Sequence, residues 1–373
     1  MMIAAVPEHR ASAPGFVQRI RRTALRGLPA MFKPRDALFV FRRQLRDGAI
    51  VDAGLSVRYS LITLIALAQE SPRSCGAALH GMDPATVLRQ AADRTLAIGD
   101  VALAYWAAIA LRDHQQREQL RARLHALEPD VRRCPMVDLA WALTALSLDA
   151  TSGEGGLRDR VARRITSLYH ERSATFPHVA GGTAALRRHV ACFADQIYPI
   201  QALAEYVART SDPRALRVAE SAAQHLCARQ GPAGQWWWHY DTRTGDIVER
   251  YPVYAVHQDG MAPMALRALE RVSRLRFGQW IARGLEWLDA SPELGGGSLV
   301  DDDNAVIWRK VARHEPMRAA RYLQAAATRV RPGSVWPGLD RCFPPGAVDF
   351  ECRPYHLAWL LYAWPDSSGS DRV

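Results

Sequence analysis

Aromatic and ionisable side chains gather between residues 230 and 264, where the sequence reads QGPAGQWWWHYDTRTGDIVERYPVYAVHQDGMAPM. Aromatic faces can hold the flat side of a ligand while polar tips orient it, so such mixtures often line a concave site. A loop that packs over a helical core would have the same composition. The substrate-binding side chains expected in this segment are Trp236, Trp237, Trp238, His239, Tyr240 and Tyr254.

Three acidic residues and one histidine are candidates for catalytic proton transfer. Asp241, His257 and Asp259 lie in the aromatic segment, and Asp303 lies further along the chain. Two carboxylates across a glycosidic bond can act as acid and base, and a histidine can transfer protons near neutral pH. Asp259 would equally serve as the N-cap of the helix that follows it.

A polar group near the C-terminus is expected to complete the site. Arg353, Tyr355 and His356 lie close together in the sequence and are expected to bind substrate. In a lyase or an epimerase, the guanidinium of Arg353 would neutralise the carboxylate of a uronate. A Tyr or His side chain would then transfer the proton.

Helical periodicity shows which elements must position these residues. Apolar residues recur at helical spacing through most of the chain, whereas the alternation typical of strands is nearly absent. Helices are expected at residues 54–70, 84–93, 98–113, 116–127, 136–148, 156–170, 196–209, 213–229, 258–272, 275–289, 303–313, 315–329 and 352–363.

These helices form antiparallel pairs with short turns. DQIYPIQALAEYVARTSD precedes PRALRVAESAAQHLCARQ, with Ser211 or Asp212 as N-cap and Pro213 in the first turn. About six hairpins that each bury one face against neighbours can close into a ring. We therefore expect an all-α (α/α)6 toroid as a single domain in residues 51–373. A basic N-terminal arm in residues 1–50, with little core of its own, would pack on that domain or touch a membrane surface.

Loops at the ends of hairpins carry a resemblance to known families. Gln230-x-x-x-Gly234-x-Trp236 resembles the Q-x-x-x-G-x-W repeat of squalene-hopene cyclases and other terpenoid cyclases, and residues 293–299 and 331–338 are degenerate versions. Similar loops close hairpins in six-hairpin glycosidases and in related polysaccharide lyases and epimerases. These families share the (α/α)6 toroid, so the resemblance implies a fold more than a chemistry.

The acidic run Asp301, Asp302 and Asp303 carries a second resemblance. It is similar to the D-x-D-D motif of class II terpenoid cyclases, in which an Asp protonates an alkene or an epoxide. Val300 occupies the first position of that motif, and Asn304 follows the run in place of the usual Thr. The same residues would also suit the negatively charged first turn of a helix.

Three functions remain open from these residues. We favour a carbohydrate-active enzyme, a hydrolase, lyase or epimerase that acts on an oligosaccharide or polysaccharide in a Trp-lined central cavity. His and Asp side chains among the tryptophans suit a sugar better than a hydrocarbon. The alternatives are a terpenoid cyclase-like enzyme that uses the acidic run, and a non-catalytic helical scaffold that binds a glycan or a partner.

Composition narrows the partners and the compartment. The formal charge of +10 comes almost entirely from Arg, since Lys33 and Lys310 are the lysines of the chain. The Arg residues lie mostly beside Asp or Glu, which argues against nucleic-acid binding. No apolar run approaches the ~20 residues that span a bilayer, and no secretory signal is recognisable. Six scattered cysteines favour free thiols in a cytoplasmic protein. Cys342, Cys352 and His356 lack the spacing of a zinc site, so we expect neither metal nor cofactor.

Overall fold

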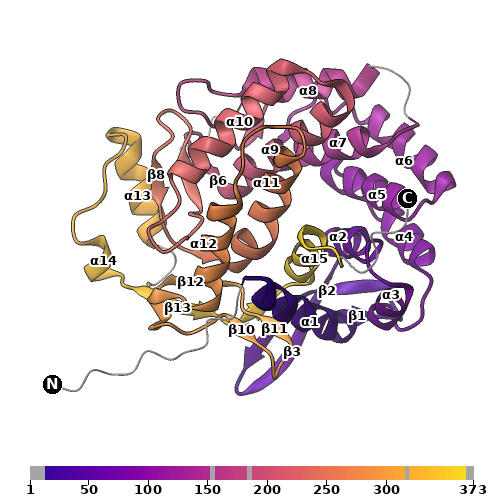
Figure 1. The fold of residues 1–373 in the computed structure, drawn as a ribbon, viewed down its shortest axis with the longest axis horizontal. Coiled ribbons are helices and arrows are strands. Elements are labelled where there is room, and N and C mark those ends of the chain that lie inside the picture. Colours follow the sequence, from indigo (N-terminus) through magenta and orange to yellow (C-terminus); the bar gives the residue numbers. More distant parts are fainter. Residues whose placement is uncertain (1–12, 152–155, 183–186, 316–318, 367–373) are drawn as a thin grey trace.

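The inner wall of the molecule is a closed ring of helices (Figure 1). The computed structural model describes residues 13–151, 156–182, 187–315 and 319–366. Each inner helix contacts the next one, and α15 closes the ring by contacting both α2 and η1. The inner helices in chain order are α2 (Val57–Leu67), α5 (Ile98–Ala110), α7 (Met136–Leu148), α9 (Phe193–Thr210), the π-helical turn η1 (His257–Met261) continued by α11 (Ala262–Glu270), and α15 (Pro354–Ala363).

A second layer of helices surrounds this ring. Each outer helix packs on the inner element that precedes it in the chain, except α1, which packs on α15. The outer helices are α1 (Ala13–Met31), α4 (Pro84–Ala92), α6 (His114–Ala126), α8 (Gly156–Leu168), α10 (Pro213–Ala228) and α12 (Gly278–Asp289). The predicted (α/α)6 toroid is thereby confirmed. Four helical elements of the described residues are additional to the two layers: α3 (Pro72–Ala78), η2 (Pro292–Leu294), α13 (Ala319–Val330) and α14 (Leu339–Cys342).

Hydrophobic patterning explains which helices lie inside. The inner helix α5 reads IGDVALAYWAAIA and is buried on nearly every side. The outer helix α10 buries one face, with Val218, Ala222 and Leu226 turned to the ring. A helix that is apolar all round is stable only when other elements cover it completely, whereas a one-sided helix suits the outer layer. At the start of α10, the Asp212 side chain accepts the backbone N–H groups of Arg214 and Ala215, so Asp212 rather than Ser211 is the N-cap of the two that the sequence allowed.

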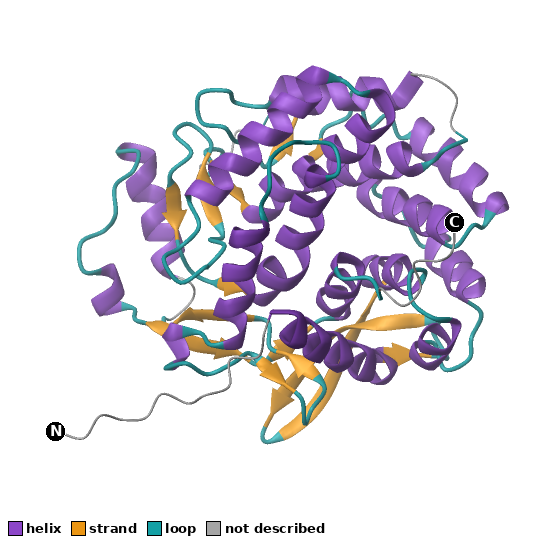
Figure 2. Ribbon diagram, viewed as in Figure 1, coloured by secondary structure: helices purple, strands orange, loops and turns teal. Residues whose placement is uncertain are grey.

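Strands occur in the segments that lead into inner helices (Figure 2); most have two to five residues, whereas β2 and β3 have nine and eight. β3 pairs with β2, which lies between β1 and β14; β7 lies between β6 and β8; and β12 lies between β9 and β13. These segments join the end of one hairpin to the start of the next, so the sheets lie where inner helices begin. The strands are β1 (Phe32–Lys33), β2 (Leu38–Arg46), β3 (Ala49–Ser56), β4 (Cys134–Pro135), β5 (Val179–Ala180), β6 (Val190–Cys192), β7 (His239–Asp241), β8 (Ile247–Glu249), β9 (Val253–Tyr254), β10 (Val300–Asp301), β11 (Val306–Ile307), β12 (Lys310–Arg313), β13 (Pro345–Asp349) and β14 (Glu351–Cys352).

The helix predicted over residues 303–313 is wrong. This segment forms the hairpin of β10 and β11 followed by β12. The carboxylate of Asp301 accepts the backbone N–H of Asn304, and Ala305 has a left-handed backbone with φ of 52°. A tight turn therefore replaces the expected first helical turn, and the residues after it extend into strands.

The N-terminal part of the chain is more integrated than the expected arm. Helix α1 buries Phe16, Ile20, Ala24 and Leu28 in the main core, so its apolar face is already covered. The expected boundary at residue 50 falls inside β3, which pairs with β2. Residues 1–12 of that arm and residues 367–373 of the toroid lie outside the described part. Within the described ranges, no helix combines the length and apolarity needed to cross a membrane.

The Q-x-x-x-G-x-W loop has a structural role. The side-chain amide of Gln230 donates to the carbonyl oxygens of Gly234 and Trp280, at 2.9 and 2.8 Å, and so ties the loop to α12. Gly234 has φ of +98°, and a Cβ there would lie 2.0 Å from the carbonyl oxygen of Arg283. This motif therefore fastens one hairpin to the next and contributes to the fold.

Candidate active site

A carboxylate with a free oxygen lies at the start of α9. Asp195 is the third residue of that helix and is fully buried. Its Oδ2 accepts the backbone N–H of Cys192 at 2.7 Å and lies 2.9 Å from Nδ1 of His178. Its Oδ1 has no hydrogen-bond partner among the described residues. The first oxygen is thus fixed by the protein, and the second remains available as an acceptor.

His178 joins α9 to the neighbouring inner helix. Its carbonyl oxygen accepts the backbone N–H of Met136, the first residue of α7, at 3.0 Å. The adjacent strand β5 pairs with β4, which leads directly into α7. The hydrogen bond to Asp195 raises the pKa of His178, and its side chain is 56% exposed. A partly exposed imidazole backed by a buried carboxylate can exchange protons with a ligand.

A second buried carboxylate lies at the start of α7. Asp138 is the third residue of that helix, and burial raises its pKa despite the opposing charge of Arg58 and a hydrogen bond from the Gly99 backbone. The nearest guanidinium nitrogen of Arg58 is 3.6 Å from Oδ1 of Asp138, and Arg58 is held by Asp100 at 2.6 Å. Asp138 therefore keeps its proton to a higher pH than an exposed Asp, as a general acid requires.

Gly99 creates the space for this carboxyl group. A Cβ at residue 99 would lie 2.3 Å from both Cγ and Oδ1 of Asp138. Gly99 is the second residue of α5, so three adjacent inner helices, α2, α5 and α7, fix the environment of Asp138.

The two carboxylates occupy equivalent positions on neighbouring helices. α7 contacts α9, and Asp138 and Asp195 are each the third residue of their helix. The two carboxyl groups therefore belong to the first turns of two helices that pack directly on each other. A pair of carboxyl groups that flanks the scissile bond is what glycoside hydrolysis uses.

Aromatic residues extend the site from α9 toward η1. Trp238 stacks on His239, with ring centroids 3.9 Å apart, and meets the edge of Tyr254 at 5.4 Å. Tyr254 lies 5.1 Å from His257, which stacks on Phe193 at 4.4 Å. Trp238 is partly exposed, so its ring can contact a ligand. Burial lowers the pKa of His257 to about 3, so this predicted catalytic residue is neutral at physiological pH.

Residues from α2 and α15 continue the aromatic surface. Arg353 donates to the Tyr59 hydroxyl at 2.7 Å, and Tyr59 lies 4.6 Å from Tyr355. Arg309 and Arg353 both pair with Glu351, and Arg309 lies over Tyr254 at 5.2 Å, which connects this group with Trp238 and His257. The structure thus brings together Trp238, His239, Tyr254, His257, Arg353 and Tyr355, six of the residues singled out from the sequence.

Two arginines add positive charge beside Trp238. Arg321 lies 5.6 Å from the Trp238 ring, and both Arg321 and Arg187 lie over Tyr322, at 4.8 and 5.5 Å. Burial and the charge of Arg321 lower the pKa of Arg187. Neither guanidinium pairs with a carboxylate in the described part of the chain. Two adjacent cations of this kind favour an anionic ligand.

Three aromatic residues singled out from the sequence lie in the core instead. Trp236 and Tyr240 are fully buried, and Trp237 is 4% exposed. Trp236 packs on Phe193, and Trp237 meets the edge of Tyr251. Their rings are covered by protein, so they support the site without presenting a face to a ligand.

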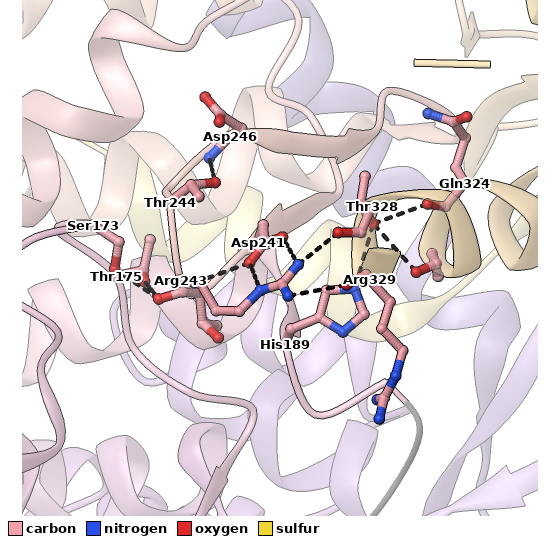
Figure 3. A network of polar contacts seen from close by, with 12 residues as sticks. Ser173, Thr175, His189, Asp241, Arg243, Thr244, Asp246, Gln324, Thr328 and Arg329 are labelled. Atoms are coloured by element: carbon pink, nitrogen blue, oxygen red, sulfur yellow. Dashed lines mark hydrogen bonds and ion pairs between the residues drawn. The ribbon is translucent and has the colours of Figure 1, made fainter. Parts of the chain in front are cut away.

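Asp241 holds a helix in place (Figure 3). Its carboxylate binds the guanidinium of Arg243, with the two nearest contacts at 2.7 and 3.0 Å. The same guanidinium reaches the carbonyl oxygens of Thr328 and Arg329 on α13. Both carboxylate oxygens are therefore committed to fastening α13 against β7, and this predicted catalytic residue is placed for a structural role.

Asp259 and His356 form a buried pair between η1 and α15. His356 Nε2 lies 3.0 and 2.9 Å from the two carboxylate oxygens of Asp259, and both side chains are almost fully buried. Trp364 donates its indole N–H to the Asp259 carbonyl oxygen at 2.7 Å. Burial raises the pKa of Asp259, opposed by His356. This pair joins the last two inner elements of the ring, and Asp259 is not the N-cap of a helix.

The acidic run lies in the β10–β11 hairpin next to α1. Asp302 pairs with Arg19 at 2.7 Å and accepts the Thr23 hydroxyl, while Asp303 is exposed. The carboxylates of the run are thus engaged by an outer helix or exposed to solvent, and the terpenoid cyclase-like alternative loses its basis. A metal could be considered at His178, Cys192 and Asp195, whose donor atoms lie within 4.8 Å of one another. Burial raises the pKa of Cys192 well above its ordinary value, which disfavours the thiolate that a metal needs.

Comparisons with known proteins agree with the architecture. No family model and no curated protein matches the chain. In fold it is similar to an unsaturated glucuronyl hydrolase specific for heparin, at 13% identity and a TM-score of 0.59, with 93% of this chain and 95% of that chain covered. It is also similar to an unsaturated glucuronyl hydrolase from Bacillus sp. GL1, at 14% identity and a TM-score of 0.60, with the same shares of the two chains covered. A third, from Streptococcus agalactiae, shows 10% identity and a TM-score of 0.50, with 97% of each chain covered.

Proposed function

We propose that this protein is a glycoside hydrolase that acts on an oligosaccharide bearing a uronate at the end held in the ring. The observation that carries the proposal is the gathering of Asp138, His178 and Asp195 where α7 and α9 begin. Two carboxylates in unlike environments, one of them with a raised pKa, are the arrangement that acid–base hydrolysis needs.

In this proposal the two carboxylates divide the chemistry. Asp138 gives its proton to the glycosidic oxygen as the bond from that oxygen to the anomeric carbon breaks. A water molecule between the carboxylates attacks the anomeric carbon and passes a proton to Oδ1 of Asp195. His178 lies 2.9 Å from Oδ2 of Asp195 and holds that oxygen in place. Exchange of protons with solvent then returns both carboxyl groups to their starting states.

The charge distribution supports an acidic sugar as substrate. Arg187 and Arg321 lack carboxylate partners in the described ranges, and Arg353 lies beside Tyr355 and Tyr59. The N-terminal ends of inner helices carry partial positive charge and add to this field. The hydrolases that share the fold are named for a glucuronyl substrate, which agrees with a uronate. Partly exposed rings of Trp238 and Tyr355 would stack on the sugar.

The test is a hydrolysis assay on oligosaccharides with saturated or unsaturated uronates at the non-reducing end, beside neutral oligosaccharides. Release of reducing sugar is measured for all, and loss of ultraviolet absorbance is measured where a double bond is present. Asp138→Asn and Asp195→Asn should each lower kcat at least about 100-fold, since an amide cannot exchange the proton. Asp303→Asn is the matched control, because Asp303 is exposed in a hairpin, and it should leave kcat unchanged.

The binding-only alternative predicts a different result. A helical scaffold without catalysis would bind the acidic oligosaccharide and release no product from any member of the panel. Equal turnover of the Asp195→Asn variant and the wild type would also reject the proposed roles.

The six cysteines form no disulfide, which supports the expected cytoplasmic location.

A further inference from the structure

A second cavity lies beside β8, outside the helical ring. It has a volume of about 820 Å³, and its walls come from β8, α13, α14 and the 331–338 loop that the sequence singled out. α13 and α14 stand at one edge of the molecule next to β8 (Figure 1). None of the residues assigned to the candidate active site lines this cavity, so it requires a separate explanation.

Buried polar side chains hold the walls of the cavity in place. Gln324 is 2% exposed; its side-chain amide donates to the Val248 carbonyl oxygen at 3.2 Å, and its oxygen accepts the backbone N–H of Trp336 at 2.7 Å. Arg313, 5% exposed, bonds to Asp340 and to the Phe343 carbonyl oxygen, each at 2.8 Å. Strand, helix and loop are thus tied together around the space, so the site is largely preformed.

The wall contains an acceptor without a donor. Glu249 lines the cavity and is 2% exposed; its Oε1 accepts from Arg313 and from the Tyr251 backbone. Its Oε2 has no hydrogen-bond partner in the described part of the chain. A buried acceptor without a partner is costly, and a hydroxyl group of a ligand would satisfy it. A purely anionic ligand would meet repulsion at this oxygen.

An aromatic face and unpaired cations complete the lining. Trp336 is 38% exposed at the edge of the cavity. Arg229 pairs with Asp246 at 2.9 Å, whereas the exposed side chains of Arg250 and Arg341 make no ion pair among the described residues. The occupant therefore has a flat face, hydroxyl donors and negative charge.

We propose that this cavity is a second carbohydrate-binding site for an acidic oligosaccharide. Sugar hydroxyls donate to Glu249, one ring stacks on Trp336, and carboxylates of the chain face Arg250 and Arg341. The choice of an acidic saccharide rests on the proposed function. Occupancy of the cavity does not depend on it, because Glu249, Trp336 and the two arginines lie outside the candidate active site. Such a site would hold a long substrate while its end is hydrolysed in the ring.

The experiment is calorimetric titration of the full-length Asp195→Asn protein, which avoids turnover. The probe is a hexasaccharide of alternating glucuronate and N-acetylglucosamine, with neutral maltohexaose as the second arm. Two binding events are expected for the acidic probe. Trp336→Ala should remove one of them, or weaken it at least tenfold, and Glu249→Gln should weaken the same event. Trp336→Phe keeps a stacking face and should retain it. Val131→Ala, another exposed apolar residue, is the matched control.

The outcomes separate the second site from the proposed function. A single event that disappears in Trp336→Ala supports the cavity and rejects substrate binding in the ring. Unchanged binding in Trp336→Ala, with thermal unfolding equal to that of the parent, overturns the inference. Equal affinity of maltohexaose for the event sensitive to Trp336 overturns its acidic specificity. If Trp336→Ala unfolds early, Glu249→Gln and Trp336→Phe decide, because Gln has nearly the size of Glu and Phe keeps an aromatic face.

Discussion

Replacing Gly99 by Ala should damage catalysis more than folding. The added methyl would lie 2.3 Å from Cγ and Oδ1 of Asp138 and 2.8 Å from its Oδ2. Non-bonded carbon contacts are favourable at about 3.5–4.0 Å, so the carboxyl group must move by roughly 1 Å. A displacement of this size at a reacting group can lower the rate about 100-fold.

The cost to stability should be small by comparison. Overpacking a buried site costs about 1–3 kcal/mol, and Ala stabilises a helix relative to Gly by about 0.5–1 kcal/mol. The net loss of about 1–2 kcal/mol leaves most domains folded. kcat/KM on the acidic oligosaccharide and thermal unfolding are measured together. Gly278→Ala, at the first residue of α12 with open space around it, is the control and should match the wild type in kcat/KM.

A double variant tests whether the effect passes through Asp138. If it does, the double variant Gly99→Ala, Asp138→Asn should be no slower than Asp138→Asn alone. The Asn side chain that the methyl displaces has no acidic proton to donate, so its displacement costs nothing further. Full activity in Gly99→Ala would refute the assignment of Asp138 as the acid. Additive losses in the double variant would show that Gly99 acts on the site by another route.

Two further predictions concern buried carboxylates. Asp259→Asn should keep kcat/KM within a few-fold of the wild type, because the amide oxygen still accepts a hydrogen bond from His356. Asp259→Ala removes this partner of His356, and it should lower the free energy of unfolding, measured by urea denaturation, by about 3–5 kcal/mol. Asp138→Asn should raise the melting temperature at pH 7 while activity is lost. The folded pKa of Asp138 is raised, so its stabilising contribution is complete below the unfolded value of 3.8 and is lost as pH rises through the folded pKa. The gain should therefore shrink toward pH 3, and a gain that does not depend on pH would contradict this origin.

The architecture could be predicted because ring helices carry strong local signals. Apolar periodicity and the N-cap at Asp212 are properties of a single segment, and they located nearly all the inner and outer helices. The helix over residues 303–313 failed because the turn around Asp301 competes with a helix start using the same polar residues. Most strands before inner helices were missed because two to five residues give little measurable alternation. β2 and β3 are longer, with nine and eight residues, but their burial does not alternate strictly between the two faces.

Site residues were harder to predict, because their roles depend on contacts between hairpins. Asp138 and Asp195 lie at helix starts, where a carboxylate ordinarily offsets the helix dipole, so sequence gives no reason to distinguish them. His178 lies in an irregular segment, and its partner is 17 residues away. The three adjacent tryptophans differ only in what covers them: ring helices and loops bury Trp236 and Trp237 and leave Trp238 partly open.

Closure of the ring is what assembles the candidate site. The groups around Asp138 come from α2, α5 and α7; His178 and Asp195 come from the segment before α9 and from α9 itself; and the aromatic surface comes from β7, η1 and α15. No single hairpin holds more than part of this set. Burial raises the pKa of Asp138 only because neighbouring hairpins exclude water from it. The raised pKa of Asp138, which the proposed reaction needs, is therefore a property of the closed toroid. Any change that opens the ring should lower activity before it melts the helices.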